Sequence, residues 1–126
     1  MKKLHPNAEL VRQAIEAVNV GDFERLKQTI SEDTVYKVYR QGGVATVKGL
    51  EGFKQLMETV KGVINVDPLV ILADGEYVFV LARLTGKRKG KVLDTENWYL
   101  YQVRDGKLVE GRNLPTDQNA FNEFWS

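Results

Sequence analysis

Residues 96–126 read ENWYLYQVRDGKLVEGRNLPTDQNAFNEFWS, a stretch that predicts two strands, a tight hairpin and a short amphipathic helix. Asp105 and Gly106 lie between alternating runs, and Asp-Gly supplies the two positive φ angles that a two-residue type I′ hairpin turn needs. This turn predicts a regular register in which opposed residues share a face of the sheet. The predicted pairs on one face are Val103 with Leu108, Tyr101 with Glu110, Tyr99 with Arg112, and Asn97 with Leu114.

That face mixes polar and apolar side chains. Two tyrosines, an asparagine, a glutamate and an arginine accompany Val103, Leu108 and Leu114. Such a mixture is typical of a pocket lining with a few polar anchors. It is equally typical of a sheet face that is half in water and half under a helix.

Composition indicates a single globular domain, residues 1–126. Hydrophobic residues make up 43% and charged residues 28% of the chain, and the net charge is +1. This balance gives no field for a nucleic-acid backbone or an anionic membrane. The one basic run, Lys87 to Lys91, contains Gly90 and is interpreted as a solvated hairpin tip.

Cysteine and histidine usage narrows the chemistry. The chain has no cysteine, which excludes disulfides, thiolate nucleophiles and cysteine-ligated metals. Its single histidine, His5, precedes Pro6 and is interpreted as a helix-start residue, so we expect no metal and no cofactor. No apolar run has the length of a signal peptide or a membrane span, and we expect a cytoplasmic protein.

The helices are predicted from apolar residues at three- and four-residue spacing. A first helix runs from Pro6 to Val20, and a second follows the cap residue Asp22 and ends at residues 31–33. A third covers residues 50–63, with Phe53 and Met57 in its buried stripe. A short helix within residues 117–125 closes the chain.

The strands lie between and after these helices. Alternation predicts a strand at residues 35–39 and a short extended piece at residues 46–49. Pro68 marks the entry to a strand at residues 69–73, and a hairpin at residues 74–75 leads into residues 77–87. Because helices and strands are segregated along the chain, the fold class is α+β.

Several of these stretches resemble the SnoaL-like branch of the nuclear transport factor 2-like superfamily. They are residues 9–33 with Val20-Gly21-Asp22-Phe23, the run Thr46-Val47-Lys48-Gly49, and VRDGKLVEGRNLPTDQNAFNEFWS at the end. The resemblance implies a cone-shaped α+β fold, in which three N-terminal helices pack on a strongly curved antiparallel sheet followed by a short C-terminal helix. It also implies a pocket between helices and sheet, and a homodimer formed through the outer sheet face.

The family's catalytic positions are filled differently in this chain. Where ketosteroid isomerases have a tyrosine and two aspartates, this chain has Ala14, Val38 and Tyr99. Where the polyketide cyclases have their acid/base aspartate, it has Asn113, which carries no proton at neutral pH. Their pocket histidine and glutamine correspond to Tyr99 and Asn97. Asn113 shares a face with Tyr99 only if a β-bulge lies near Gly111.

The leading hypothesis is therefore a small-molecule-binding domain without the family's acid/base, whose ligand is small and hydrophobic. The predicted ligand-binding residues are Tyr36, Val38, Phe53, Met57, Asn97, Tyr99, Tyr101, Arg112 and Asn113. One alternative is an active isomerase, cyclase or hydrolase that uses Glu110 as base with Tyr99, the pKa of Glu110 being raised by an apolar pocket. For Glu110 the competing interpretation is a salt bridge to Arg112 or a lysine. A second alternative is a dimeric protein-interaction module, with Trp98 as a contact residue.

Overall fold

The computed structural model describes residues 5–40 and 42–126 and folds them into four helices and six strands. In chain order these are α1 (Pro6–Val20), α2 (Phe23–Lys27), β1 (Val35–Arg40), β2 (Gly43–Lys48), α3 (Gly49–Val60), β3 (Ile64–Asp74), β4 (Tyr77–Arg88), β5 (Lys91–Arg104), β6 (Lys107–Pro115) and α4 (Gln118–Trp125). The α+β class and the short closing helix are as the sequence predicts.

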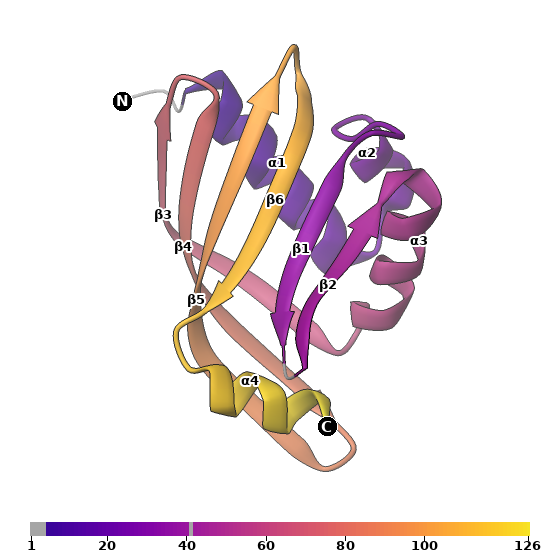
Figure 1. The fold of residues 1–126 in the computed structure, drawn as a ribbon, viewed down its shortest axis with the longest axis vertical. Helices are drawn as coiled ribbons and strands as arrows, with labels where there is room; N and C mark the ends of the chain where they lie inside the picture. The colour runs from indigo at the N-terminus through magenta and orange to yellow at the C-terminus, as the bar shows by residue number, and fades with distance from the viewer. Residues whose placement is uncertain (1–4, 41) are drawn as a thin grey trace.

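The six strands form one curved sheet in the order β2-β1-β6-β5-β4-β3. Helix α1 crosses behind the sheet, α2 and α3 lie beside β1 and β2, and α4 lies across the lower end (Figure 1). All neighbouring strands are antiparallel except β1 and β6, which run parallel. The antiparallel sheet that the resemblance implies therefore contains one parallel pair, because β2 to β5 come between β1 and β6 in the chain and no hairpin joins the two.

Helix α1 begins and ends where the sequence indicates. The Nδ1 atom of His5 accepts a hydrogen bond from the backbone N–H of Asn7 at 3.1 Å, so the single histidine serves as the N-cap. Pro6 occupies the first turn, and Gly21 ends the helix with a φ of 73°. No helix in the described part of the chain is long and apolar enough to cross a membrane.

Helix α2 ends at Lys27, earlier than predicted. The reason is that the following residues bond to other parts of the chain. The Thr29 hydroxyl donates to the Leu26 carbonyl at 2.7 Å, and the Thr29 carbonyl accepts from the N–H of Leu108 at 2.8 Å. The backbone is thereby drawn toward β6 and leaves the helical path.

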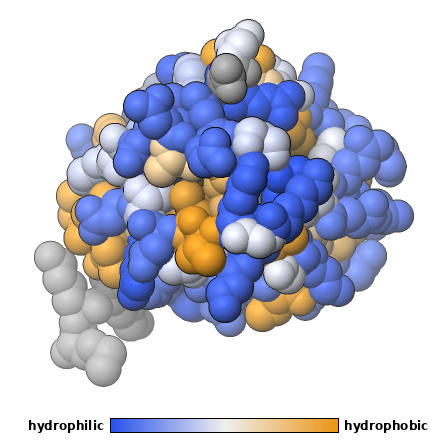
Figure 2. Space-filling view, turned by 90° about the horizontal axis from the view of Figure 1, so that it is seen from below, coloured by the Kyte–Doolittle hydropathy of each residue, from blue (hydrophilic) through white to orange (hydrophobic). Residues whose placement is uncertain are grey.

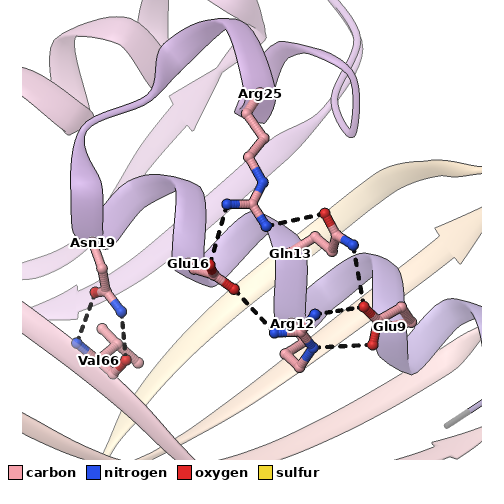
Figure 3. Close-up of polar contacts among 7 residues, drawn as sticks. All are labelled: Glu9, Arg12, Gln13, Glu16, Asn19, Arg25 and Val66. Carbon is pink, nitrogen blue, oxygen red and sulfur yellow. Dashed lines mark hydrogen bonds and ion pairs between the residues drawn. The ribbon is translucent and has the colours of Figure 1, made fainter.

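Polar side chains fix α1 to its neighbours (Figure 3). Arg12 forms a bidentate pair with Glu9, at 3.0 and 2.6 Å, and bonds Glu16 at 3.0 Å. Arg25 of α2 reaches the same Glu16 at 3.3 Å. Hydrogen bonds from Arg12 lower the pKa of Glu9 to about 2. The network therefore holds two consecutive helices in one orientation over the sheet.

Asn19 covers part of the free edge of the sheet. Its side chain donates to the Val66 carbonyl at 2.7 Å and accepts from the Val66 N–H at 2.9 Å, as Figure 3 shows. Because β3 is an edge strand, these two bonds take the place of a neighbouring strand at this residue.

Strand β3 begins at Ile64 and passes through Pro68, which the sequence analysis placed at a strand entry. The register shifts by one residue between Pro68 and Val70. An edge strand tolerates this proline because no partner needs its missing N–H. Helix α3 stops at Val60 instead of Val63, since Gly62 has a φ of 73° and the Val63 carbonyl accepts from Lys87 of β4 at 3.1 Å.

The register of the last hairpin differs from the regular one. Val103 faces Leu108 as predicted, but the pairing then shifts by one residue, so that Val109 bulges out. The pairs that follow are Gln102 with Glu110, Tyr101 with Gly111, Leu100 with Arg112, Tyr99 with Asn113, Trp98 with Leu114, and Asn97 with Pro115. The predicted partners of Tyr101, Tyr99 and Asn97 are therefore wrong by one residue.

Helix α4 closes a second part of the core. Asp117 caps it by accepting from the Ala120 N–H at 3.0 Å, and Phe121 and Phe124 are buried against Leu84 and Leu93. The larger core cluster joins α1, α2 and α3 to the upper part of the sheet. Both clusters lie on the inner face of the sheet, so the four helices surround the space between the two clusters.

Candidate functional site: an internal cavity

A cavity of about 490 Å³ lies between the helices and the inner face of the sheet. Its walls come from all four helices and all six strands of the described chain. The lining residues are Ala14, Ile15, Val18, Asn19, Leu26, Tyr36, Val38, Arg40, Ala45, Val47, Phe53, Leu56, Met57, Thr59, Val60, Ile64, Val66, Leu84, Arg88, Tyr99, Tyr101, Leu108, Asn113, Phe121 and Trp125. Most are apolar, as is usual for small-molecule sites.

Three tyrosines, Tyr36, Tyr99 and Tyr101, contribute aromatic walls and are called here the cavity tyrosines. Tyr99 and Tyr101 stack with ring centroids 6.1 Å apart, and Tyr36 lies 6.2 Å from Phe53 of α3. Burial raises the pKa of each cavity tyrosine. Their hydroxyls therefore stay protonated near neutral pH and keep the capacity to donate hydrogen bonds.

Two buried asparagines, Asn97 and Asn113, form a polar pair beside these tyrosines. Asn97 donates from Nδ2 to Oδ1 of Asn113 at 2.6 Å, and both side chains are buried. Asn113 lines the cavity, whereas Asn97 lies behind it with no exposed surface. Within the described residues, the Oδ1 atom of Asn97 has no hydrogen-bond partner. An unpaired buried carbonyl of this kind is destabilising in the absence of a donor.

The bulge at Val109 decides which β6 residues reach the cavity. It places Asn113 opposite Tyr99 on the inner face and leaves Glu110 and Arg112 on the outer face. Asn113 was expected to face inward only with a bulge near Gly111, and the bulge occurs two residues earlier. Of the predicted ligand-binding residues, those that line the cavity are Tyr36, Val38, Phe53, Met57, Tyr99, Tyr101 and Asn113.

Glu110 is part of a surface charge cluster. Its Oε1 lies 2.9 Å from Nζ of Lys37 and 3.5 Å from Nε of Arg112. The hydrogen bond from Lys37 lowers the pKa of Glu110, so the expectation that an apolar pocket raises it is wrong. The structure therefore does not bring Glu110 and Tyr99 together across one site.

Two charged residues of the described cavity wall, Arg40 and Arg88, were missed from the sequence. Arg88 was assigned to a solvated hairpin tip, but it is half-buried and its Nη1 donates to the backbone oxygens of Phe124 and Ser126, at 3.2 and 3.1 Å. A signal existed in the two-residue period of the strands. Arg40 continues the inward series of Tyr36 and Val38, and Arg88 continues that of Val80, Ala82 and Leu84.

A metal site is not formed by the described residues, in which no three His, Asp or Glu side chains gather. The cavity can hold an apolar body, accept or donate hydrogen bonds through Asn113 and the cavity tyrosines, and present two guanidinium groups. Its described lining includes no Asp, Glu, His or Lys, so groups suited to proton transfer near neutral pH do not contribute to the wall.

Comparison with known proteins identifies the class. The family model of the SnoaL-like domain matches residues 11–111, and the chain belongs to this family. The resemblance inferred from the hairpin and the helix boundaries is thereby confirmed.

Solved structures share the fold over almost the whole chain. Bal32a, from a soil-derived mobile gene cassette, is 26% identical over 96% of this chain and 97% of its own, with a TM-score of 0.87. An NTF2-like protein from Burkholderia xenovorans LB400 is 20% identical over 96% of each chain, with a TM-score of 0.83. TerC, co-crystallised with polyporic acid, is 22% identical over 95% of this chain and 98% of its own, with a TM-score of 0.80. No curated protein sequence matches the chain.

Proposed function

We propose that this SnoaL-like domain binds a small, largely apolar organic molecule in its internal cavity and does so without a general acid or base of its own. The observation that carries the proposal is the composition of the cavity wall, which is mostly apolar and includes only a few polar side chains. A cavity of about 490 Å³ falls within the size range of small-molecule sites, roughly 300–1,000 Å³. The determination of TerC with polyporic acid supports a small-molecule role for this fold.

The polar groups of the cavity favour binding over proton transfer. The resemblance to the family's cyclases implies that Asn113 stands where they have an acid/base aspartate, and an amide does not titrate near neutral pH. The cavity tyrosines have raised pKa values because they are buried. These groups orient a ligand through hydrogen bonds and leave its protons in place.

The test uses N-phenyl-1-naphthylamine, a neutral apolar dye whose fluorescence rises in an apolar site. We expect saturable binding that weakens by about tenfold or more in Val38→Trp, because the larger side chain fills part of the cavity. Tyr39→Trp is the matched control, since residue 39 does not line the cavity. Absence of saturable binding, or equal affinity of both variants and the parent, would refute the proposal.

We further propose that the outer sheet face joins two copies of the chain. Exposed large apolar side chains gather there on four neighbouring strands, namely Leu72, Tyr77, Phe79, Trp98 and Leu114. Apolar surface of this kind is a common feature of subunit interfaces.

Light scattering after size-exclusion chromatography tests this second proposal. We expect twice the chain mass for the parent and a shift to the monomer for the double variant Phe79→Glu and Trp98→Glu. Val20→Glu is the control, because Val20 is 62% exposed at the end of α1 and does not belong to the sheet. A parent that is monomeric at all concentrations would overturn the interface.

A further inference from the structure

The charge of the cavity wall has one sign. Among the described residues that line the cavity, two carry a charge, and both are arginines, Arg40 and Arg88. No carboxylate of the described lining neutralises them. In an otherwise apolar wall, two guanidinium groups favour an anionic ligand over a neutral or cationic one.

The same two arginines differ from the other arginines in their pairing. The chain has seven arginines, and the described structure pairs five of them with Asp or Glu side chains. The five are Arg12, Arg25, Arg83, Arg104 and Arg112. Arg40 and Arg88, the two that remain, form no ion pair with an Asp or Glu side chain in residues 5–40 and 42–126. The two arginines that lack an ion pair with a side chain therefore both line the cavity.

Both arginines lie at the α4 end of the fold. Arg40 is the last residue of β1 and Arg88 the last of β4, and the lower ends of these strands lie close to α4 in Figure 1. Arg40 and Thr59 are exposed members of the lining, which indicates that the cavity opens on this side. Figure 2, viewed from below, shows a hydrophobic patch framed by hydrophilic side chains at this end.

Arg88 is held in a fixed position. Its guanidinium lies 5.4 Å from the ring centroid of Trp125, which also lines the cavity, and the hydrogen bonds described for it use Nη1 alone. The Nε and Nη2 donors of Arg88 can therefore contact a ligand without breaking the bonds to α4. A charged donor that is already oriented loses little side-chain entropy on binding.

We propose that the natural ligand is an amphiphilic organic anion. Its apolar body fills the cavity between α1, α3 and the cavity tyrosines, and its anionic group lies at the opening beside Arg40 and Arg88. This proposal rests on the proposed function, since it names the chemical class of the molecule bound in the same cavity. It predicts selectivity that the apolar walls alone do not provide.

Two dyes that share one skeleton distinguish a preference for anionic ligands from the binding of any small apolar molecule. N-phenyl-1-naphthylamine is neutral, and 8-anilinonaphthalene-1-sulfonate carries the same rings with an added sulfonate. We expect the anionic dye to bind the parent protein more tightly than the neutral dye. The ratio of the two dissociation constants measures the contribution of charge, because the apolar contacts are shared.

Four variants locate that contribution. In Arg40→Gln the preference for the anion is expected to fall by about fivefold, the upper range for an exposed ion pair, and in the half-buried Arg88→Gln by about tenfold. Arg88→Lys keeps the charge and retains most of the preference. Lys87→Gln is the matched control, because Lys87 is exposed on the opposite face of β4 and the substitution removes the same charge one residue away from Arg88.

The outcomes distinguish the two proposals. If the neutral dye binds while the anionic dye binds no better, or if Lys87→Gln lowers the preference as much as Arg40→Gln, the anionic ligand class is wrong and the apolar cavity stands. If neither dye binds, the proposed function fails and this inference fails with it. Should Arg88→Gln unfold because α4 loses its bonds, Arg40→Gln decides alone, since the structure shows no bond from Arg40 to α4.

Discussion

Gly111 separates two of the tyrosine rings that form the cavity wall, and Gly111→Ala tests that arrangement directly. It is a buried residue of β6 that pairs with Tyr101 on one side and Tyr36 on the other. A Cβ atom there would lie 2.9 Å from Cδ1 of Tyr36 and 3.0 Å from Cδ1 and Cε1 of Tyr101. Carbon atoms in contact prefer about 3.5–4.0 Å, so both rings must move by about 0.5–1 Å.

The size of the effect follows from what surrounds the rings. Tyr101 is stacked on Tyr99 and Tyr36 packs against Phe53, so neither ring moves without disturbing a neighbour. Overpacking of this type costs about 1–3 kcal/mol, and the lower entropy of the unfolded chain with alanine offsets about 0.4–1 kcal/mol. The open cavity gives the rings space to shift. We therefore expect a net loss of about 1–2 kcal/mol in the free energy of unfolding.

Urea denaturation followed by circular dichroism measures this loss, and dye titration measures its effect on the cavity. Because the rings relieve the clash by moving inward, the affinity for N-phenyl-1-naphthylamine should fall in the same variant. Gly52→Ala is the control, since its Cβ would meet the end of the Val47 side chain, at 3.2 Å from Cγ1, and alanine favours the helix. Unchanged stability together with unchanged dye affinity in Gly111→Ala would refute the assignment of Gly111 as the spacer between the rings.

Three further predictions concern the frame of the cavity. Gly86→Ala should be more destabilising than Gly111→Ala in the same urea assay, because its Cβ would lie 2.5 Å from the Val63 carbonyl oxygen, a backbone atom that cannot rotate away. Equal losses of unfolding free energy in the two variants would contradict this prediction. Asn19→Ala should lose about 1–3 kcal/mol of unfolding free energy, since both backbone groups of Val66 lose their partner, whereas the exposed Asn65→Ala should change it by less than about 0.5 kcal/mol. The pKa values of the cavity tyrosines are raised, so their contribution to stability is complete below the usual tyrosine pKa of about 10 and is lost as the pH rises beyond it. Absorbance from the phenolate forms of these tyrosines should therefore appear together with unfolding. Phenolate absorbance from them in a fully folded protein would contradict their burial.

Local signals in the sequence predicted the elements that local chemistry determines. His5, Pro6 and Gly21 carry the boundaries of α1, and Asp117 carries the start of α4, because caps and left-handed residues act over a single turn. The end of α2 was not predictable in this way. It depends on the carbonyl of Thr29 accepting from a strand that follows almost eighty residues later, and no local pattern contains that bond.

The charged part of the cavity was missed for a different reason. Alternation places Arg40 and Arg88 on the inner face of their strands, but a rule that assigns arginine to solvent overrides it. The rule fails here because the strands extend beyond the packed core to the cavity opening, where a long side chain can keep its guanidinium near water. Read with the period of the strands given priority over residue type, the same sequence would have indicated two cations on the inner face.

The β-bulge at Val109 shows why the candidate site depends on one residue of register. With regular pairing, Glu110 and Arg112 would face Tyr101 and Tyr99, and the cavity would contain a carboxylate with a partner cation, a plausible catalytic pair. With the bulge, Asn113 faces Tyr99, and Glu110 and Arg112 instead join Lys37 on the outer face. Burial explains the choice, since the regular register would place two charges on the inner face and the small Gly111 on the outer one. The energetic cost of burying those charges therefore favours the bulge, and the bulge in turn leaves amide, phenol and guanidinium groups as the polar groups of the cavity wall.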